Sequence, residues 1–253
     1  MTASVPRLMF ACALLWATCF AHGAEAPDLY DAAVRNPARS ADDVKRDGRD
    51  YPAELLRLAG ITPGMRVADL LAANGYYSEL VSYVVGPKGH VLMLNNAAFD
   101  GWSGGWEQRL AGNRLPNVEH QRIDLNSMNL GSGTLDAVLL IKVYHDLYWV
   151  DPKGEWPKVD VASTLDQVAR ALKPGGVLLL VDHSAKAGSG STAASPLHRI
   201  EEAFARQDFE SRGLELTGQS NLLRRPDDQR DLLSYDGPGL NKTDRFVLVF
   251  RKR

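Results

Sequence analysis

Residues Asp69 to Tyr77 read DLLAANGYY and give the strongest indication of the fold class. An apolar run, Met65 to Leu71, leads into this stretch, and a run with helical spacing, Ser78 to Val85, follows it. A buried strand, a turn of small residues and a helix form the repeating unit of α/β proteins, and this turn is where many of them bind a nucleotide. Only one glycine, Gly75, stands here. The stretch is therefore either a ligand-binding loop or an ordinary connection between a strand and a helix.

The same alternation of apolar runs and helical segments continues along the chain. Near-continuous apolar runs separated by helices predict a parallel sheet that is covered on both faces. We expect one doubly wound α/β domain over residues 25–253, with a mostly parallel seven-stranded sheet and helices on both faces. The expected strands are Arg66–Leu71, His90–Leu94, Val118–Ile123, Leu135–Val143, Val177–Val181, Leu214–Gln219 and Phe246–Phe250.

Capping residues and turns set the expected ends of several helices. Ser40 is placed to cap a helix that begins at Ala41, and Lys173–Gly176, KPGG, predicts a turn before a strand. Ser195-Pro196 predicts the start of a helix that continues past Ile200 and stops near Gly213, because Pro suits the first helical position. On that helix, His198 is a candidate to close over a substrate, and Arg199 is expected at the surface.

The first 24 residues predict a signal peptide. Arg7 precedes an apolar run of 13 residues, Leu8 to Phe20, which is too short to span a bilayer, and small residues follow at Ala21–Ala24. Both cysteines of the chain, Cys12 and Cys19, lie inside this segment. The mature chain would then hold no cysteine, which suits a periplasmic or secreted protein without disulfides or stable membrane insertion.

The predicted signal peptide can be tested by mass spectrometry. The intact mass of protein from the periplasmic fraction should correspond to a chain that begins near Ala24 or Glu25. Recovery of only the full-length chain, from the cytoplasm, would contradict it.

The composition excludes some partners. The chain has 253 residues, 45% of them hydrophobic and 24% charged, and a net charge of -2. This balance supports one domain with a full core and gives no basic surface for nucleic acid. The expected partner is a small molecule, and the sequence does not indicate an oligomeric state.

Polar and small residues follow the expected strands in a fixed order. Asp69 with Gly75 follows the first strand, Asn95 the second and Asp124 the third, and LKPGG at Leu172–Gly176 precedes the fifth. This order resembles that of class I S-adenosylmethionine-dependent methyltransferases. Four further motifs are YHDLYW at 144–149, LHRI at 197–200, LLRRPDD at 222–228 and KTDRFVLVFRK at 242–252. With these motifs, nearly the whole mature chain resembles a group of exported bacterial predicted methyltransferases.

The resemblance implies a Rossmann-like methyltransferase fold that binds S-adenosyl-L-methionine. The residues that it places at the cofactor are Asp69, Ala72, Ala73, Gly75, Asn95, Asp124 and Leu125. The chain departs from the family pattern because Leu71 and Ala73 replace the first two glycines of the loop and Asn95 replaces a carboxylate that binds the ribose. Two interpretations stay open: a weakened cofactor loop, or a plain turn in a domain that has lost or changed its ligand. If Asn95 contacts the ribose, Asn95→Asp should raise the affinity for the cofactor about five- to tenfold.

The candidates for catalysis follow the fourth and fifth strands. His145 is a candidate general base, because an imidazole with an ordinary pKa accepts a proton near neutral pH. Asp146 would orient His145, Tyr144 would face the methyl group, and His183 would converge on the same cleft. Each of these side chains has a structural alternative, in loop packing or in capping.

Two further features of the sequence each allow two interpretations. Asp146, Asp182, His145 and His183 could form a metal site, since metal-dependent catechol methyltransferases use carboxylates at matching places, but no ligand spacing is diagnostic and we predict no metal. The tryptophans at 102, 106, 149 and 156 either wall an acceptor pocket or pack long loops onto the sheet.

The sequence therefore predicts methyl transfer from S-adenosylmethionine to a small acceptor. The alternative is an exported binding module that keeps the fold without the catalysis. The alternative gains support from the altered loop and from Asn95, and because the methyl donor is made in the cytoplasm.

Overall fold

The computed structural model describes Met1 and residues 28–253, so the expected signal peptide lies outside the described residues. Seven strands form one sheet in the order β3-β2-β1-β4-β5-β7-β6, in which β7 runs antiparallel to both of its neighbours. The strands are β1 Arg66–Leu70, β2 His90–Asn95, β3 Val118–Arg122, β4 Leu135–Ile141, β5 Leu172–His183, β6 Leu214–Ser220 and β7 Arg245–Lys252. The predicted fold class is confirmed, and each predicted strand is present with its ends shifted slightly or, in β5, extended.

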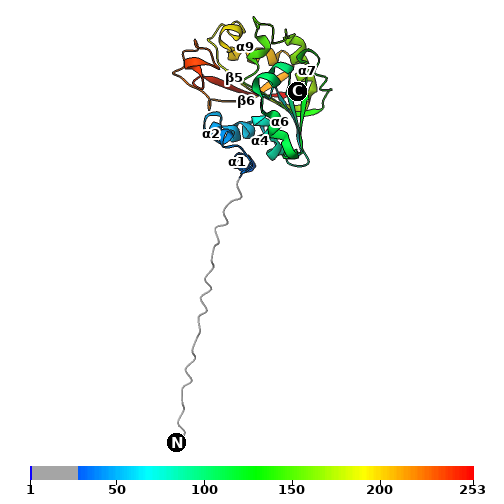
Figure 1. The fold of residues 1–253 in the computed structure, drawn as a ribbon. Coiled ribbons are helices and arrows are strands. Elements are labelled where there is room, and N and C mark those ends of the chain that lie inside the picture. Colours follow the sequence, from blue (N-terminus) through cyan, green and yellow to red (C-terminus); the bar gives the residue numbers. More distant parts are fainter. Residues whose placement is uncertain (2–27) are drawn as a thin grey trace.

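Helices cover both faces of this sheet (Figure 1). Alternate residues of β4 enter two separate cores: Val138 and Leu140 pack toward α7 and α9, and Ala137 and Leu139 pack toward α3 and α4. This is the pattern of a strand that is buried on both sides. The helices are α1 Leu29–Val34, α2 Ala41–Asp50, α3 Pro52–Ala59, α4 Tyr76–Val85, α5 Ala97–Ser103, α6 Trp106–Leu110, α7 Val161–Ala171, α8 Ala194–Leu197 and α9 Glu202–Glu210. Short 3₁₀ helices are η1 Ala111–Asn113, η2 Leu125–Ser127, η3 His145–Tyr148 and η4 Gly237–Gly239.

Of two local predictions, the cap at Ser40 is confirmed and the turn before a strand at Lys173–Gly176 is wrong. The Ser40 side chain accepts a hydrogen bond from the N–H of Asp43 and caps α2. The KPGG stretch does not separate a helix from a strand but lies inside β5, where the pairing with β4 shifts register between Leu135 and Ala137. Within the described part of the chain, no helix is both long and apolar enough to span a membrane.

The long helix predicted from Ser195-Pro196 is wrong. The chain forms the short helix α8, turns at His198 with a left-handed backbone (φ 48°), and begins α9 only at Glu202. Between them Ile200 bridges to Ser184 beside the end of β5, donating its N–H to the His183 carbonyl (2.9 Å). Arg199 is fully buried, not exposed, and its guanidinium pairs with Asp228 (2.7 Å). This ion pair and the bridge at Ile200 override the local helical pattern.

Candidate active site

The loop between β1 and α4 has a left-handed backbone at the two positions where Leu71 and Ala73 stand in place of glycine. Leu71 (φ 56°) and Ala73 (φ 55°) are both left-handed, a conformation that non-glycine residues seldom adopt. Gly75 (φ 81°) caps α4, and a Cβ atom there would lie 2.8 Å from the Cε of Met93. The strained backbone at the two replaced positions is of the kind that is often kept at functional sites.

A cavity of about 230 Å³ lies against this loop, at the carboxyl ends of β1 and β4. Ala72 and Ala73 line it with their small side chains, and Asp69 lines it as well. Arg46 reaches it from α2 and Lys142 from the end of β4. In open α/β sheets, ligands bind at this end of the strands.

Asp69 is nearly fully buried, and it accepts a hydrogen bond from the Ser78 hydroxyl (2.7 Å). Burial raises the pKa of the Asp69 carboxyl to about 6. A carboxyl with a raised pKa destabilises the folded state whenever it is ionised, that is, above that pH. Asp69 therefore costs stability at neutral pH, which is typical of a residue kept for binding.

Asp69→Asn should raise the free energy of unfolding by about 1–2 kcal/mol at pH 8, since the amide carries no charge to bury. The gain should vanish as the pH falls through 6 toward 4, where the wild-type carboxyl takes up its proton. Thermal unfolding at both pH values measures this. Asp136→Asn is the control and should destabilise, because Lys173 and the N–H of Arg66 hold the pKa of Asp136 below its usual range despite burial. A lower melting temperature for Asp69→Asn at pH 8 would contradict the prediction.

Asn95 does not face this cavity. Its side chain is fully buried and joined to the backbone of Ala73 twice: Oδ1 accepts from the Ala73 N–H (3.0 Å) and Nδ2 donates to the Ala73 carbonyl (2.9 Å). Nδ2 also donates to Asp100 (3.0 Å), which in turn contacts His120 and Arg122. Asn95 therefore holds the loop, and the predicted ribose contact is not favoured by this geometry.

Asp124 and Leu125 are not brought to the cavity either. Asp124 caps η2 by accepting from the N–H of Asn126 (2.9 Å), and Leu125 is buried in the core on the α7 side. Asn96, which follows Asn95, has a buried Nδ2 without a hydrogen-bond partner among the described residues. Its Oδ1 accepts from the N–H of Phe99 (2.9 Å) and caps α5.

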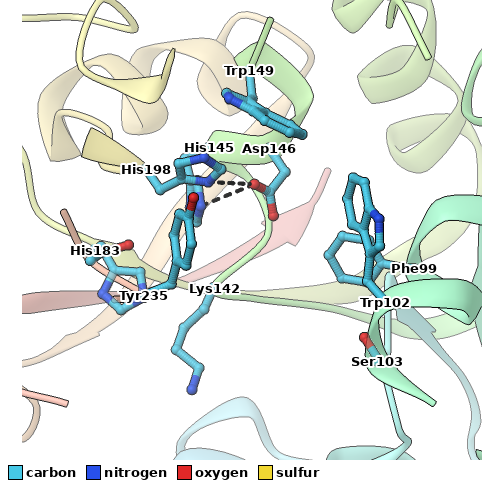
Figure 2. A pocket seen from close by; sticks show the side chains of 11 residues that line it. Phe99, Trp102, Ser103, Lys142, His145, Asp146, Trp149, His183, His198 and Tyr235 are labelled. Atoms are coloured by element: carbon cyan, nitrogen blue, oxygen red, sulfur yellow. Dashed lines mark hydrogen bonds and ion pairs between the residues drawn. The ribbon is translucent and has the colours of Figure 1, made fainter. Parts of the chain in front are cut away.

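A second pocket, of about 470 Å³, adjoins the first and shares Phe99 and Lys142 with it. His145, Asp146 and His183 line this pocket together, so the structure brings three of the four candidate catalytic residues to one place. Figure 2 shows His145 and His198 directed at the carboxylate of Asp146, with Trp102 and Phe99 across the open space and Lys142 extending away from them.

Tyr144 does not reach the pocket lining. Its ring is fully buried against Phe209, and its hydroxyl donates to Asp208 (2.6 Å). Burial raises the pKa of the Tyr144 hydroxyl above its ordinary value. The contacts of Tyr144 are therefore those of a core residue.

Both ring nitrogens of His145 face carboxylates. Nδ1 lies 2.7 Å from Oδ1 of Asp182, and Nε2 lies 3.1 Å from Oδ1 of Asp146. Although burial by itself lowers it, these two carboxylates raise the pKa of His145 to about 10. The imidazole thus holds its proton at neutral pH in these surroundings, which does not suit a general base. The base role of His145 stays a prediction that the geometry does not favour.

The tryptophans divide between the two roles considered from the sequence. Trp102 and Trp149 line the larger pocket, with ring centroids 6.0 Å apart. Trp156 is buried behind them, and Trp106 stacks on His120 at 3.6 Å. Two of the four therefore wall a pocket, and two pack loops onto the sheet.

Sequence reasoning missed Lys142, Arg46 and Tyr235 as pocket residues. Lys142 directly follows β4 and is a charged residue between the apolar residues Ile141 and Val143, and it has a left-handed backbone (φ 63°), so a charge at the end of a buried strand was the available signal. Burial, together with the neighbouring Arg46, lowers the pKa of Lys142 to about 8. Tyr235 lies in a late loop whose sequence carries no comparable pattern.

Comparison with known proteins supports the fold and does not by itself establish an activity. The sequence matches no protein-family model and no curated protein. A S-adenosylmethionine-dependent methyltransferase from Aquifex aeolicus is similar in structure (TM-score 0.60, 20% identity, 84% of this chain and 95% of that chain). So is the [4+2]-cyclase SpnF (TM-score 0.62, 12% identity, 86% and 84%). So is an arsenic(III) S-adenosylmethionine methyltransferase from Chlamydomonas reinhardtii (TM-score 0.55, 16% identity, 90% and 74%). At these identities the likeness shows a Rossmann-like methyltransferase fold.

Proposed function

We propose that this protein transfers a methyl group from S-adenosylmethionine to a small acceptor molecule. The observation that carries the proposal is the pair of adjoining cavities at the carboxyl ends of the strands. One lies against the β1–α4 loop, the other is walled by aromatic side chains, and the two share Phe99 and Lys142. A methyl transferase of this fold needs a donor and an acceptor side by side, because the reaction is a direct displacement.

The residues around the smaller cavity fit the amino-acid end of the cofactor. Arg46 offers a cation for its carboxylate and Asp69 an acceptor for its ammonium group, while Ala72 and Ala73 leave room for close approach of the backbone. The bound cofactor supplies a methyl group that is already activated on a sulfonium. The work of this chain is then to align the acceptor and to exclude water.

The aromatic wall and Lys142 define the acceptor side. Trp102 and Trp149 suit an apolar or aromatic molecule, and the ammonium group of Lys142 would stabilise negative charge on an acceptor oxygen. With a pKa of about 8, Lys142 keeps most of that charge at neutral pH.

The second candidate is a binding module that keeps the fold without methyl transfer. The burial of Asn95 favours it, because the position at which the family binds the ribose is closed by hydrogen bonds to Ala73 and Asp100. The structural likeness to a [4+2]-cyclase is also consistent with other uses of this fold.

Calorimetric titration with S-adenosylmethionine separates the two candidates. We expect saturable binding to the wild-type protein, and we expect Ala72→Trp to weaken it about tenfold or more by filling the cavity, a loss of ~1.4 kcal/mol or more. Ala187→Trp places the same side chain on an exposed loop and should bind as wild type does. No binding of the donor to folded wild-type protein would reject methyl transfer and support the binding module.

A further inference from the structure

We propose that His145, Asp146 and His198 bind one divalent transition-metal ion in the wall of the aromatic pocket. Each of the three residues offers one ligand atom, and these atoms all lie within 4.8 Å of one another. Oδ1 of Asp146 is 3.1 Å from Nε2 of His145 and 3.1 Å from Nδ1 of His198 (Figure 2). Ligand atoms around a tetrahedral zinc ion are roughly 3.3 Å apart, given bond lengths near 2.0 Å. The carboxylate oxygen of Asp146 therefore already stands near the required spacing from each of the two imidazole nitrogens.

The surroundings of His145 hold it as a metal ligand. Asp182 is fully buried; one of its oxygens faces Nδ1 of His145 (2.7 Å) and the other accepts from the backbone N–H of His145 (2.8 Å). An imidazole that donates its Nδ1 proton to a carboxylate presents the lone pair of Nε2 to a metal. Carboxylate, histidine and metal in this order is the usual arrangement of a protein metal site.

His198 is held in place by the break between α8 and α9. Its left-handed backbone, the buried ion pair of Arg199 with Asp228 and the bridge of Ile200 to β5 fix the segment from both sides. A regular helix through this segment, as the sequence pattern predicts, would not keep this backbone. The strain at His198 is explained if its side chain has a task at Asp146.

The charge and the donor set indicate the class of metal. The carboxylates of Asp146 and Asp182 are both buried beside His145, and a divalent cation compensates them. Two imidazoles and one carboxylate suit zinc or iron(II) better than magnesium or calcium, which prefer oxygen ligands alone. Three protein ligands leave coordination positions open, as catalytic rather than structural metal sites do.

The open positions would face the pocket that Trp102, Trp149 and Tyr235 line. Ser234 lines the same pocket, and its buried hydroxyl has no hydrogen-bond partner among the described residues, so it is available to a ligand. The pocket therefore suits a small aromatic molecule whose anionic oxygen binds the metal. Metal binding does not depend on methyl transfer, whereas the identification of this molecule as the methyl acceptor rests on the proposed function.

The test uses zinc and cobalt(II) ions alone on purified, chelator-treated protein. Calorimetry should show one zinc ion bound per chain, and cobalt(II) should give the visible absorption of a site with nitrogen ligands and low coordination number. His198→Gln keeps the size of the side chain and removes the ligand, and Asp182→Asn removes the group that orients His145. Each should weaken zinc binding about 10–100-fold or more. His120→Gln alters another histidine–aspartate pair and should bind zinc as the wild type does.

Circular dichroism of each variant shows whether it is folded. If His198→Gln does not fold, Asp182→Asn provides the test of the metal site. A wild-type protein that binds neither ion, or folded variants that bind zinc as tightly as wild type, would overturn the metal site. In that case the protonated imidazole of His145, and not a metal ion, pairs with the carboxylates of Asp146 and Asp182. Zinc binding without binding of S-adenosylmethionine would support the metal site and reject the proposed function. Binding of S-adenosylmethionine without zinc binding would support the proposed function and reject the metal site.

Discussion

Replacing His145 by alanine should lower the free energy of unfolding by about 3–5 kcal/mol at neutral pH in chelator-treated protein. His145 lies between Asp146 and Asp182, and all three residues are buried. The protonated imidazole is the partner of both carboxylates. Without it, two negative charges remain in the interior with no cation between them, and the loss of a partner from a buried ion pair is strongly destabilising.

The stabilisation by His145 should decrease as the pH rises. The pKa of His145 is raised from 6.5 to about 10. The folded state therefore binds the proton more tightly than the unfolded state does. The stabilisation is fully present below pH 6.5 and is lost as the pH rises through 10. Urea unfolding should accordingly show a larger difference between wild type and variant near pH 6 than near pH 10.

His183→Ala is the matched control for His145→Ala. His183 lines the same pocket, and among the described residues its ring forms a hydrogen bond only with the hydroxyl of Thr243 (2.6 Å). Burial together with the charged His145 lowers the pKa of His183 well below 6.5. Its removal should cost about 1–2 kcal/mol and show no such dependence on pH. A His145→Ala protein as stable as wild type at pH 7 would refute the double ion pair.

If His145 also acts directly on an acceptor, the folded variant should turn over about 100-fold more slowly.

The second large effect reverses an expectation drawn from the sequence. Asn95→Asp should destabilise the protein by about 2–4 kcal/mol instead of strengthening cofactor binding. The Asn95 Nδ2 donates to the Ala73 carbonyl and to Asp100. A carboxylate cannot donate either bond, and it would stand about 3 Å from the carboxylate of Asp100 in a site closed to water. The β1–α4 loop would lose its support as well.

Asn96→Asp is the matched control for Asn95→Asp, because Asn96 is also buried and adjacent in sequence. Its Oδ1 caps α5 at the Phe99 N–H, and its Nδ2 has no partner among the described residues. An aspartate keeps the cap and places a negative charge at a helix N-terminus, so the change in stability should stay within about 1 kcal/mol. Urea unfolding of both variants at pH 7 and pH 5 measures the difference. The deficit of Asn95→Asp should shrink at pH 5, where a shared proton restores one donor. A gain in affinity for S-adenosylmethionine without loss of stability would show that Asn95 contacts the ribose after all.

The amino-acid sequence determined the architecture because the relevant signals are local. Apolar runs on strands buried from both sides, the helical spacing of Tyr76–Val85 and the caps at Ser40 and Gly75 each involve residues close together in the chain. These signals depend on backbone geometry and on burial, and neighbours in sequence suffice to specify them. They predicted the sheet, its helices and the end of the sheet at which a ligand binds.

The tertiary structure alone decided which side chains meet at the site. His145 meets Asp182 across 37 residues of sequence, and Asp146 meets His198 across 52. His198 meets Asp146 at the break between α8 and α9, where the buried pair of Arg199 with Asp228 and the bridge of Ile200 to Ser184 replace the helix that the local pattern favours. Asn95 turns from the expected ribose toward Ala73 because its amide satisfies both the donor and the acceptor of that backbone. Contacts between segments far apart in sequence outweigh local preference at these positions, since a buried polar group that lacks its partner costs more than a broken helix turn.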